Sequence, residues 1–250
     1  MSHSADAATR LLDPLRGDRR LLLVVAASTE ACRVVEGVTG SRPETLRVLW
    51  QPQELDDRVS LLLTGVGKAN AAGAVGHALS RESFGAVVSL GIGGSLPTDE
   101  SGSSFHHEIG DIIRCEQSVF ADEGVISDDG WQSMADRGFG PRTNLSEPAS
   151  MGVGSDSRAL ELLAGRFPDL GSAATVSTCS GTAEAAWNTA ARSGCTVEAM
   201  EGAAVGLAVL RSSPETPFVE LRVISNRTGT DQRWDLPYAL DRLTDLASAL

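Results

Sequence analysis

The sequence predicts one α/β domain with three layers, in which a central mixed, largely parallel sheet is flanked by helices. Short runs of leucine and β-branched residues alternate with stretches of helical character, the pattern of parallel strands joined by crossover helices. The strand candidates are apolar almost throughout, which is typical of a sheet covered on both faces. At 250 residues, with no internal repeat or obvious linker, the chain has the length of a single large domain.

The strand candidates are short, and each is bounded by polar or glycine-containing segments. In chain order they are Leu21–Ala26, Arg58–Thr64, Ala86–Leu90, Asp111–Val119, Ala173–Ser177 and Phe218–Ile224. The helix candidates lie between or after them, at Glu30–Gly37, Lys68–Ser80, Asp156–Arg166, Glu184–Arg192 and Gly202–Arg211. Two of these helices, Lys68–Ser80 and Gly202–Arg211, are rich in alanine and glycine, which favours close packing against a sheet or another helix.

Two segments depart from the alternation of strands and helices. Residues 1–20 are polar and mixed in charge, so we expect a loose tail followed by a domain over 21–250. The stretch Phe120–Ser150 is rich in Asp, Gly, Ser and Pro and predicts a long loop. Loops of this length in a compact domain are usually functional lids or mobile segments.

The charge balance excludes several classes of function. With 33 acidic and 21 basic residues, the net charge of −12 repels nucleic acids and anionic membranes. No apolar run is long enough to span a bilayer, and the N-terminus lacks the apolar core of a signal peptide. The four cysteines are far apart in the sequence and predict free thiols in a reducing cytoplasm.

Glycine-rich loops follow two of the predicted strands. Gly65-Val66-Gly67 opens a helix, and Gly91-Ile92-Gly93-Gly94 comes after Leu90. Glycines at the carboxyl ends of parallel strands let a ligand approach the backbone. Neither loop has the spacing of a dinucleotide site or a P-loop, so we expect a small-molecule site without a cofactor.

The sequence gives little support for a metal centre. His106 and His107 are adjacent, so on a strand they would point to opposite sides, and no HExxH pattern accompanies them. No Cys-x-x-Cys pair is present. A Gly-x-Ser-x-Gly nucleophile motif is also missing.

Three polar residues stand at the ends of apolar segments, where a ligand would bind. Glu30 follows the first strand, Glu201 precedes a helix of small residues, and Asn226 ends the last strand. Taken singly, each has an ordinary structural explanation. A carboxylate at a helix start interacts favourably with the helix dipole, and asparagine is common in turns.

Taken together, these motifs resemble the purine nucleoside phosphorylase and nucleosidase superfamily over nearly the whole chain, from about residue 21 to 250. The resemblance is carried by a strand-end Glu like Glu30, a glycine loop like 91–94, and a Gly-Asp-Ile strand start like 110–112. A Met-Glu pair like Met200-Glu201 and a late Ser-Asn like Ser225-Asn226 complete it.

The resemblance implies a nucleosidase fold and a role for each matching residue. Glu30 would activate the attacking water, Glu201 would bind the ribose hydroxyls and Met200 would pack against the sugar. Asn226, next to Ser225, would contact the leaving base, and the backbone at Ile92 and Gly93 would line the site. Because the net charge is −12, we also expect a cationic side chain to meet an anionic group of the substrate, with Arg227 and Arg233, both after Asn226, as candidates. The implied assembly is a homo-oligomer of two or more copies.

Asn226 bears on the choice of base. Relatives that cleave 6-aminopurines carry Asp there, whereas an amide donates a hydrogen bond to N7 or to a 6-oxo group without supplying a proton. This favours hypoxanthine as the leaving base. The aromatic residue that stacks on the base in those relatives is missing, which leaves Trp187 and Phe120 as substitutes.

Three alternatives to this hydrolase remain open at the level of sequence. One is a nucleosidase for 6-aminopurine substrates. Another is a phosphorylase, although the Gly-Asp-Pro-x-Arg phosphate loop of hexameric phosphorylases is missing, which favours water as the nucleophile. The third is an inactive nucleoside-binding protein, against which the presence of both carboxylates and Asn226 argues.

Overall fold

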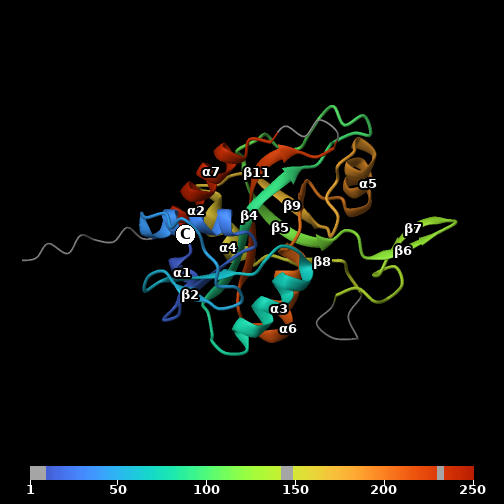
Figure 1. The fold of residues 1–250 in the computed structure, drawn as a ribbon. Helices are drawn as coiled ribbons and strands as arrows, with labels where there is room; N and C mark the ends of the chain where they lie inside the picture. The colour runs from blue at the N-terminus through green and yellow to red at the C-terminus, as the bar shows by residue number, and fades with distance from the viewer. Residues whose placement is uncertain (1–9, 142–148, 230–233) are drawn as a thin grey trace, which may run out of the picture.

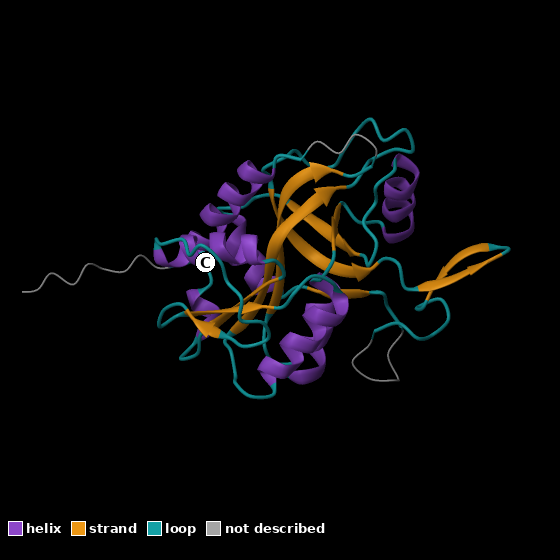
Figure 2. Cartoon of the chain, viewed as in Figure 1, coloured by secondary structure: helices purple, strands orange, loops and turns teal. Residues whose placement is uncertain are grey.

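A computed structural model describes residues 10–141, 149–229 and 234–250. The chain forms a mixed sheet with helices packed on it (Figures 1 and 2). β1 (Leu21–Val25) lies between β3 (Val59–Leu63) and β4 (Ala86–Ser95), parallel to both. β4 pairs in parallel with β11 (Phe218–Arg227), which runs antiparallel to β5 (Ile112–Phe120). The α/β fold class with a mixed sheet is therefore confirmed.

The sheet closes on itself on one side, which the sequence did not predict. β5 pairs with β9 (Leu170–Thr175), β9 with β10 (Val197–Ala199), and β10 returns to β4. Strands β4, β11, β5, β9 and β10 thus form a closed ring. Within this ring β4 and β11 have ten residues each, whereas β10 has three. A register irregularity interrupts the pairing of β11 with β4 between Ile224 and Asn226.

Helices cover the sheet on both faces. α2 (Ser28–Thr39) and α7 (Leu236–Ala249) pack together on one face, where α4 (Ser157–Ala164) contributes to the same core cluster. α3 (Lys68–Leu79) and α6 (Gly202–Ser212) pack together on the other. α5 (Ala183–Ser193) lies beside β9 at the closed end. Two further short strands pair with this sheet, β2 (Gln53–Glu54) with β3 and β8 (Gly152–Gly154) with β5.

The predicted strands and helices all occur, but two strands run further than expected. β4 continues through the glycines 91–94, which we had placed in a loop, and β11 continues through Asn226. α7 was not predicted. The stretch expected to be a long loop contains an antiparallel hairpin of β6 (Gly124–Ser127) and β7 (Gly130–Ser133), which projects from the domain (Figure 1). Its strands are too short to give a clear sequence signal. Residues 142–148 of that stretch lie outside the described residues.

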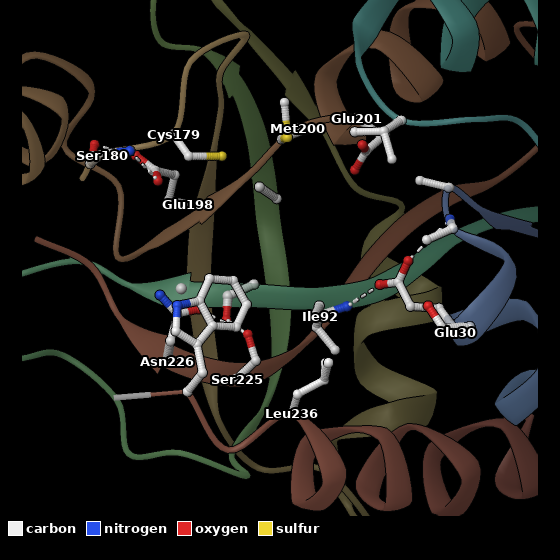
Figure 3. Close-up of a pocket in the computed structure, with 18 residues that line it drawn as sticks. Glu30, Ile92, Cys179, Ser180, Glu198, Met200, Glu201, Ser225, Asn226 and Leu236 are labelled. Atoms are coloured by element: carbon white, nitrogen blue, oxygen red, sulfur yellow. Dashed lines mark hydrogen bonds between the residues drawn. The ribbon is translucent and has the colours of Figure 1, made fainter. Parts of the chain in front are cut away.

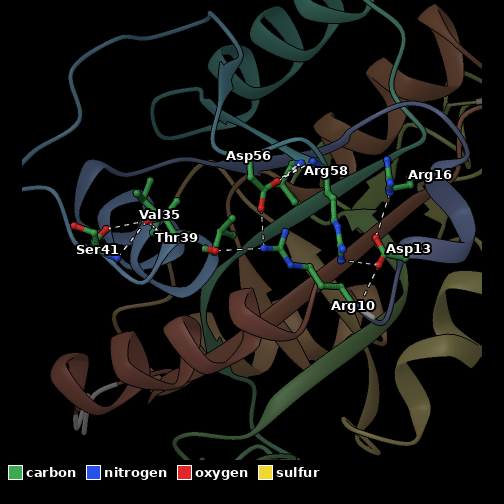
Figure 4. Close-up of polar contacts among 10 residues, drawn as sticks. Arg10, Asp13, Arg16, Val35, Thr39, Ser41, Asp56 and Arg58 are labelled. Atoms are coloured by element: carbon green, nitrogen blue, oxygen red, sulfur yellow. Dashed lines mark hydrogen bonds and ion pairs between the residues drawn. The ribbon is translucent and has the colours of Figure 1, made fainter. Parts of the chain in front are cut away.

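The domain begins earlier than residue 21. Leu12 is fully buried, and the short helix α1 (Asp13–Arg16) follows it. Arg10 forms an ion pair with Asp56 at 2.7 Å, and Asp13 forms one with Arg58 at 3.1 Å (Figure 4). The part of the expected tail that the structure describes, residues 10–20, is therefore packed against the domain. No helix in the described part of the chain is long and apolar enough to cross a membrane.

Candidate active site

A cavity of about 350 Å³ opens where β4, β10 and β11 meet the starts of α2, α6 and α7. Most of the residues predicted for the site line it, although they come from distant parts of the sequence (Figure 3). The lining residues are Ala26, Ala27, Thr29, Glu30, Val66, Ile92, Gly93, Gly94, Cys179, Ser180, Glu198, Ala199, Met200, Glu201, Ser225, Asn226, Trp234 and Leu236.

Glu30 is held in the first turn of α2 by two backbone donors. The Ile92 N–H donates to its Oε1 at 2.8 Å, and the Ala27 N–H donates to its Oε2 at 3.2 Å. Only 7% of Glu30 is exposed, and burial raises the pKa of its carboxyl, while the Ile92 hydrogen bond and Arg222 oppose that rise. A buried carboxylate with a raised pKa is suited to act as a general base.

Glu201 stands immediately before α6, on the same side of the cavity as Glu30 (Figure 3). Its Oε1 accepts a hydrogen bond from the Gly67 N–H at 3.0 Å. Gly67 has a φ of 95°, a conformation that favours glycine, so the glycine loop after β3 serves to present this donor. The predicted glycine loop therefore positions a carboxylate rather than a phosphate.

Arg222 on β11 lies close to the carboxylates of Glu30 and Glu201, and its role was not predicted from the sequence. Its side chain is almost fully buried, with Nε 2.7 Å from Glu220 and Nη2 3.8 Å from Glu201. Burial alone would lower the pKa of Arg222, but the carboxylates of Glu220 and Glu201 raise it. The guanidinium therefore stays protonated. A charged pair within an otherwise apolar strand was the available signal.

Gly91 on β4 makes room for this arrangement. A Cβ placed on Gly91 would lie 2.7 Å from both a terminal nitrogen of Arg222 and Oε1 of Glu30. Without a side chain at residue 91, the backbone of β4 passes close to the two charged groups without displacing them. This close approach is the requirement that Gly91 meets.

Asn226 lies at the opposite end of the cavity from Glu30 (Figure 3). It is 5% exposed, and its Oδ1 accepts a hydrogen bond from the Ser225 hydroxyl at 2.9 Å. Its Nδ2 donates to the Arg227 carbonyl at 3.3 Å. Because an amide nitrogen has two protons, Asn226 can donate a second hydrogen bond to a ligand.

Glu198 on β10 is a second residue that the sequence analysis did not select. Only 6% of it is exposed, and it receives hydrogen bonds from the backbone N–H of Ser180 at 2.9 Å and the Ser180 hydroxyl at 2.5 Å. Burial raises the pKa of its carboxyl, although the Ser180 hydrogen bonds act in the opposite direction. Cys179 lies next to it on the cavity wall.

Seven of the residues predicted for the site lie together in the cavity lining, namely Glu30, Glu201, Asn226, Met200, Ile92, Gly93 and Ser225. Arg227 does not line the cavity. The Arg227 guanidinium pairs with Glu108 at 2.8 Å and lies over the Phe105 ring at 5.3 Å. Arg233 lies outside the described residues.

The two aromatic residues proposed for stacking on a base are also away from the cavity lining. The Lys68 ammonium lies over the Phe120 ring, and Trp187 on α5 packs against an apolar cluster. Trp234, which was not predicted, lines the cavity instead. His107 forms a hydrogen bond with Thr196, and the described residues contain no group of three or more potential metal ligands.

Comparison with known proteins gives relatives along most of the chain. Residues 44–250 match the family described as the phosphorylase superfamily. The chain is 33% identical to futalosine hydrolase of Acidothermus cellulolyticus over 237 residues, covering 92% of this chain and 89% of that protein. It is 32% identical to futalosine hydrolase of Streptomyces coelicolor over 238 residues, covering 92% and 94%.

Solved structures with the same fold are more distant in sequence. A 5'-methylthioadenosine/S-adenosylhomocysteine nucleosidase from Neisseria meningitidis, in complex with methylthio-immucillin-A, matches with a TM-score of 0.69 at 17% identity. The match covers 92% of this chain and 98% of that one. A futalosine hydrolase mutant of Helicobacter pylori matches with a TM-score of 0.66 at 16% identity, covering 92% and 94%.

Proposed function

The chain belongs to the phosphorylase superfamily and, within it, to the futalosine hydrolases, and on this premise we propose that it hydrolyses the N-glycosidic bond of futalosine. The products are hypoxanthine and dehypoxanthine futalosine, in the alternative route to menaquinone. The single observation that best supports this function is one cavity with two buried carboxylates at one end and an amide at the other.

The carboxylate end is suited to the sugar. Glu30 accepts a proton from a water molecule, whose oxygen then bonds to C1' of the ribose as the bond to the base breaks. Glu201 accepts hydrogen bonds from the ribose hydroxyls, and its charge stabilises the positive charge that develops on the sugar. Met200 packs against the sugar. Arg222 is a positioning residue, because it orients both carboxylates without lining the cavity.

The amide end is suited to the base. As the bond to C1' breaks, its electron pair moves onto the purine, and negative charge spreads over the ring. The Asn226 amide donates a hydrogen bond to N7 or to the 6-oxo group. A proton from water completes the hypoxanthine, and the hydroxide that remains takes up the proton that Glu30 had accepted. Ser225 fixes the orientation of that amide through the hydrogen bond to Oδ1.

No cationic side chain is among the described residues that line the cavity. A phosphate nucleophile would need such a group to offset its charge, so the lining favours water. We propose that the reaction requires no cofactor or metal and that the enzyme works as a cytoplasmic homo-oligomer of two or more copies.

Substrate comparison tests the proposed function. Purified protein is incubated with futalosine, inosine and methylthioadenosine, and the released base is measured by chromatography. We expect the highest kcat/KM for futalosine and the lowest for methylthioadenosine, whose base has a 6-amino group. A preference for methylthioadenosine would favour the 6-aminopurine nucleosidase instead, and binding without turnover would indicate a nucleoside-binding protein.

A further inference from the structure

Glu198 is a buried, cavity-lining carboxylate for which the sugar chemistry has no use. It comes from β10, and Figure 3 shows it at the Asn226 end of the cavity, away from Glu30 and Glu201. Burying an ionisable group is costly unless it has partners. Because Glu198 lines the cavity, a contact with the ligand would explain why the chain has a buried carboxylate at this position.

The strand pairing places Glu198 and Asn226 on either side of one glycine. Glu198 is the register partner of Gly94 on β10, and Asn226 is the register partner of Gly94 on β11. Residues opposite one another on neighbouring strands point to the same face, and two strand spacings separate the outer residues by about 10 Å. The carboxylate and the amide therefore flank a gap of about the width of a base.

Gly94 makes room on the Asn226 side of that gap. A Cβ on residue 94 would lie 3.2 Å from Nδ2 of Asn226 and 2.6 Å from the Thr228 methyl group. The φ of Gly94 is not positive, so the backbone conformation itself does not require glycine. What favours glycine here is the close approach of the Asn226 and Thr228 side chains to β4.

Glu198 retains the capacity to bind a ligand. The hydrogen bonds that it receives within the described part of the chain come from Ser180, one on each carboxylate oxygen. A carboxylate has about four acceptor positions. In its ionised form a carboxylate can only accept hydrogen bonds, so the remaining acceptor positions of Glu198 suit a ligand that presents an N–H.

We propose that Glu198 is a specificity-determining residue that accepts a hydrogen bond from the N1–H of the hypoxanthine base, opposite Asn226. This inference rests on the proposed function. Hypoxanthine has a donor at N1 and acceptors at O6 and N7, which complement Glu198 and Asn226 in turn. Adenine has an acceptor at N1, which would face the Glu198 carboxylate without a proton between them. The pair thus discriminates between 6-oxo and 6-amino bases.

The Glu198→Gln variant tests the proposal through the ratio of kcat/KM for futalosine to kcat/KM for its 6-amino analogue. The glutamine oxygen keeps a hydrogen bond from Ser180, while its NH₂ group faces N1. We expect kcat/KM for futalosine to fall about 100-fold relative to that for the 6-amino analogue of futalosine. The matched control Glu161→Gln makes the same change at an exposed position on α4 that does not line the cavity, and it should keep the ratio of the wild type.

A purely structural role for Glu198 would lower both activities alike. An unchanged ratio in a Glu198→Gln enzyme that still cleaves futalosine would therefore overturn this inference and leave the proposed function standing. Failure of the wild type to cleave futalosine would overturn both.

A second measurement uses the wild type alone. Hypoxanthine should inhibit the enzyme at least about tenfold more tightly than 1-methylhypoxanthine, which lacks the N1–H. Equal inhibition by the two bases would contradict the proposal even if the variant does not fold.

Discussion

Replacing Glu201 with glutamine removes one charge from the sugar end of the cavity while keeping the shape of the side chain. The glutamine oxygen can still accept the hydrogen bond from the Gly67 N–H, which is 3.0 Å long in the wild type. Arg222 loses a carboxylate at 3.8 Å but keeps Glu220 at 2.7 Å. We therefore expect the fold to persist, with a change of about 1–2 kcal/mol in the free energy of unfolding.

The expected loss of activity follows from the missing charge. Opposite unit charges about 4 Å apart interact by roughly 4 kcal/mol at the effective dielectric constant of a protein site. That interaction is present mainly in the transition state, when the ribose becomes cationic. Since about 1.4 kcal/mol corresponds to a factor of ten in rate, kcat should fall about a thousandfold, within a range of about 10² to 10⁴.

The assay is hypoxanthine release from saturating futalosine, with circular dichroism to verify folding. The exposed Glu184 provides a matched control, because Glu184→Gln removes the same charge from a residue that does not line the cavity and should keep full activity. A folded Glu201→Gln enzyme with kcat within about tenfold of the wild type would refute the role of Glu201 in stabilising the sugar cation.

Three further predictions concern the base, the pH dependence and the anionic end of the substrate. Asn226→Asp should shift the ratio of kcat/KM from futalosine toward its 6-amino analogue, because a carboxylate repels the 6-oxo group and can carry a proton to N7; a ratio that stays constant would argue against Asn226 as the base-reading group. Because Glu30 must be ionised to accept a proton and burial raises its pKa, kcat/KM should fall as the pH drops through a value above the usual glutamate range. A pH–rate profile whose acid limb lies at or below that range would contradict this role. Arg227→Ala should leave KM for futalosine and for inosine equally unaffected, since its guanidinium pairs with Glu108 outside the cavity lining; a selective rise in KM for futalosine would instead support the contact predicted from the sequence.

The sequence predicted the elements that carry strong local signals. The apolar strands and the flanking helices were recognisable because each has its own composition, and Glu30, Glu201 and Asn226 stand where such elements end. Their roles came from the family resemblance. The cavity that unites them depends on contacts between segments more than a hundred residues apart, such as the hydrogen bond from Gly67 to Glu201.

The residues that were missed depend on strand pairing. Glu198 gains its position from the short β10, which closes the ring against β4, and three residues give too little pattern to predict. Arg222 and Glu220 lie within an apolar strand and become meaningful only once both are buried together. We expected Arg227 at the cavity because it follows Asn226 directly in the sequence. Adjacent residues on a strand point to opposite faces, and both belong to β11.

The most direct test of the proposed hydrolysis is the time course of futalosine cleavage in buffer with and without phosphate. The account predicts equal rates of hypoxanthine release in both buffers, with dehypoxanthine futalosine as the sugar product in each. Release that requires phosphate and yields a sugar 1-phosphate would contradict the account, because the nucleophile would then be phosphate and the enzyme a phosphorylase.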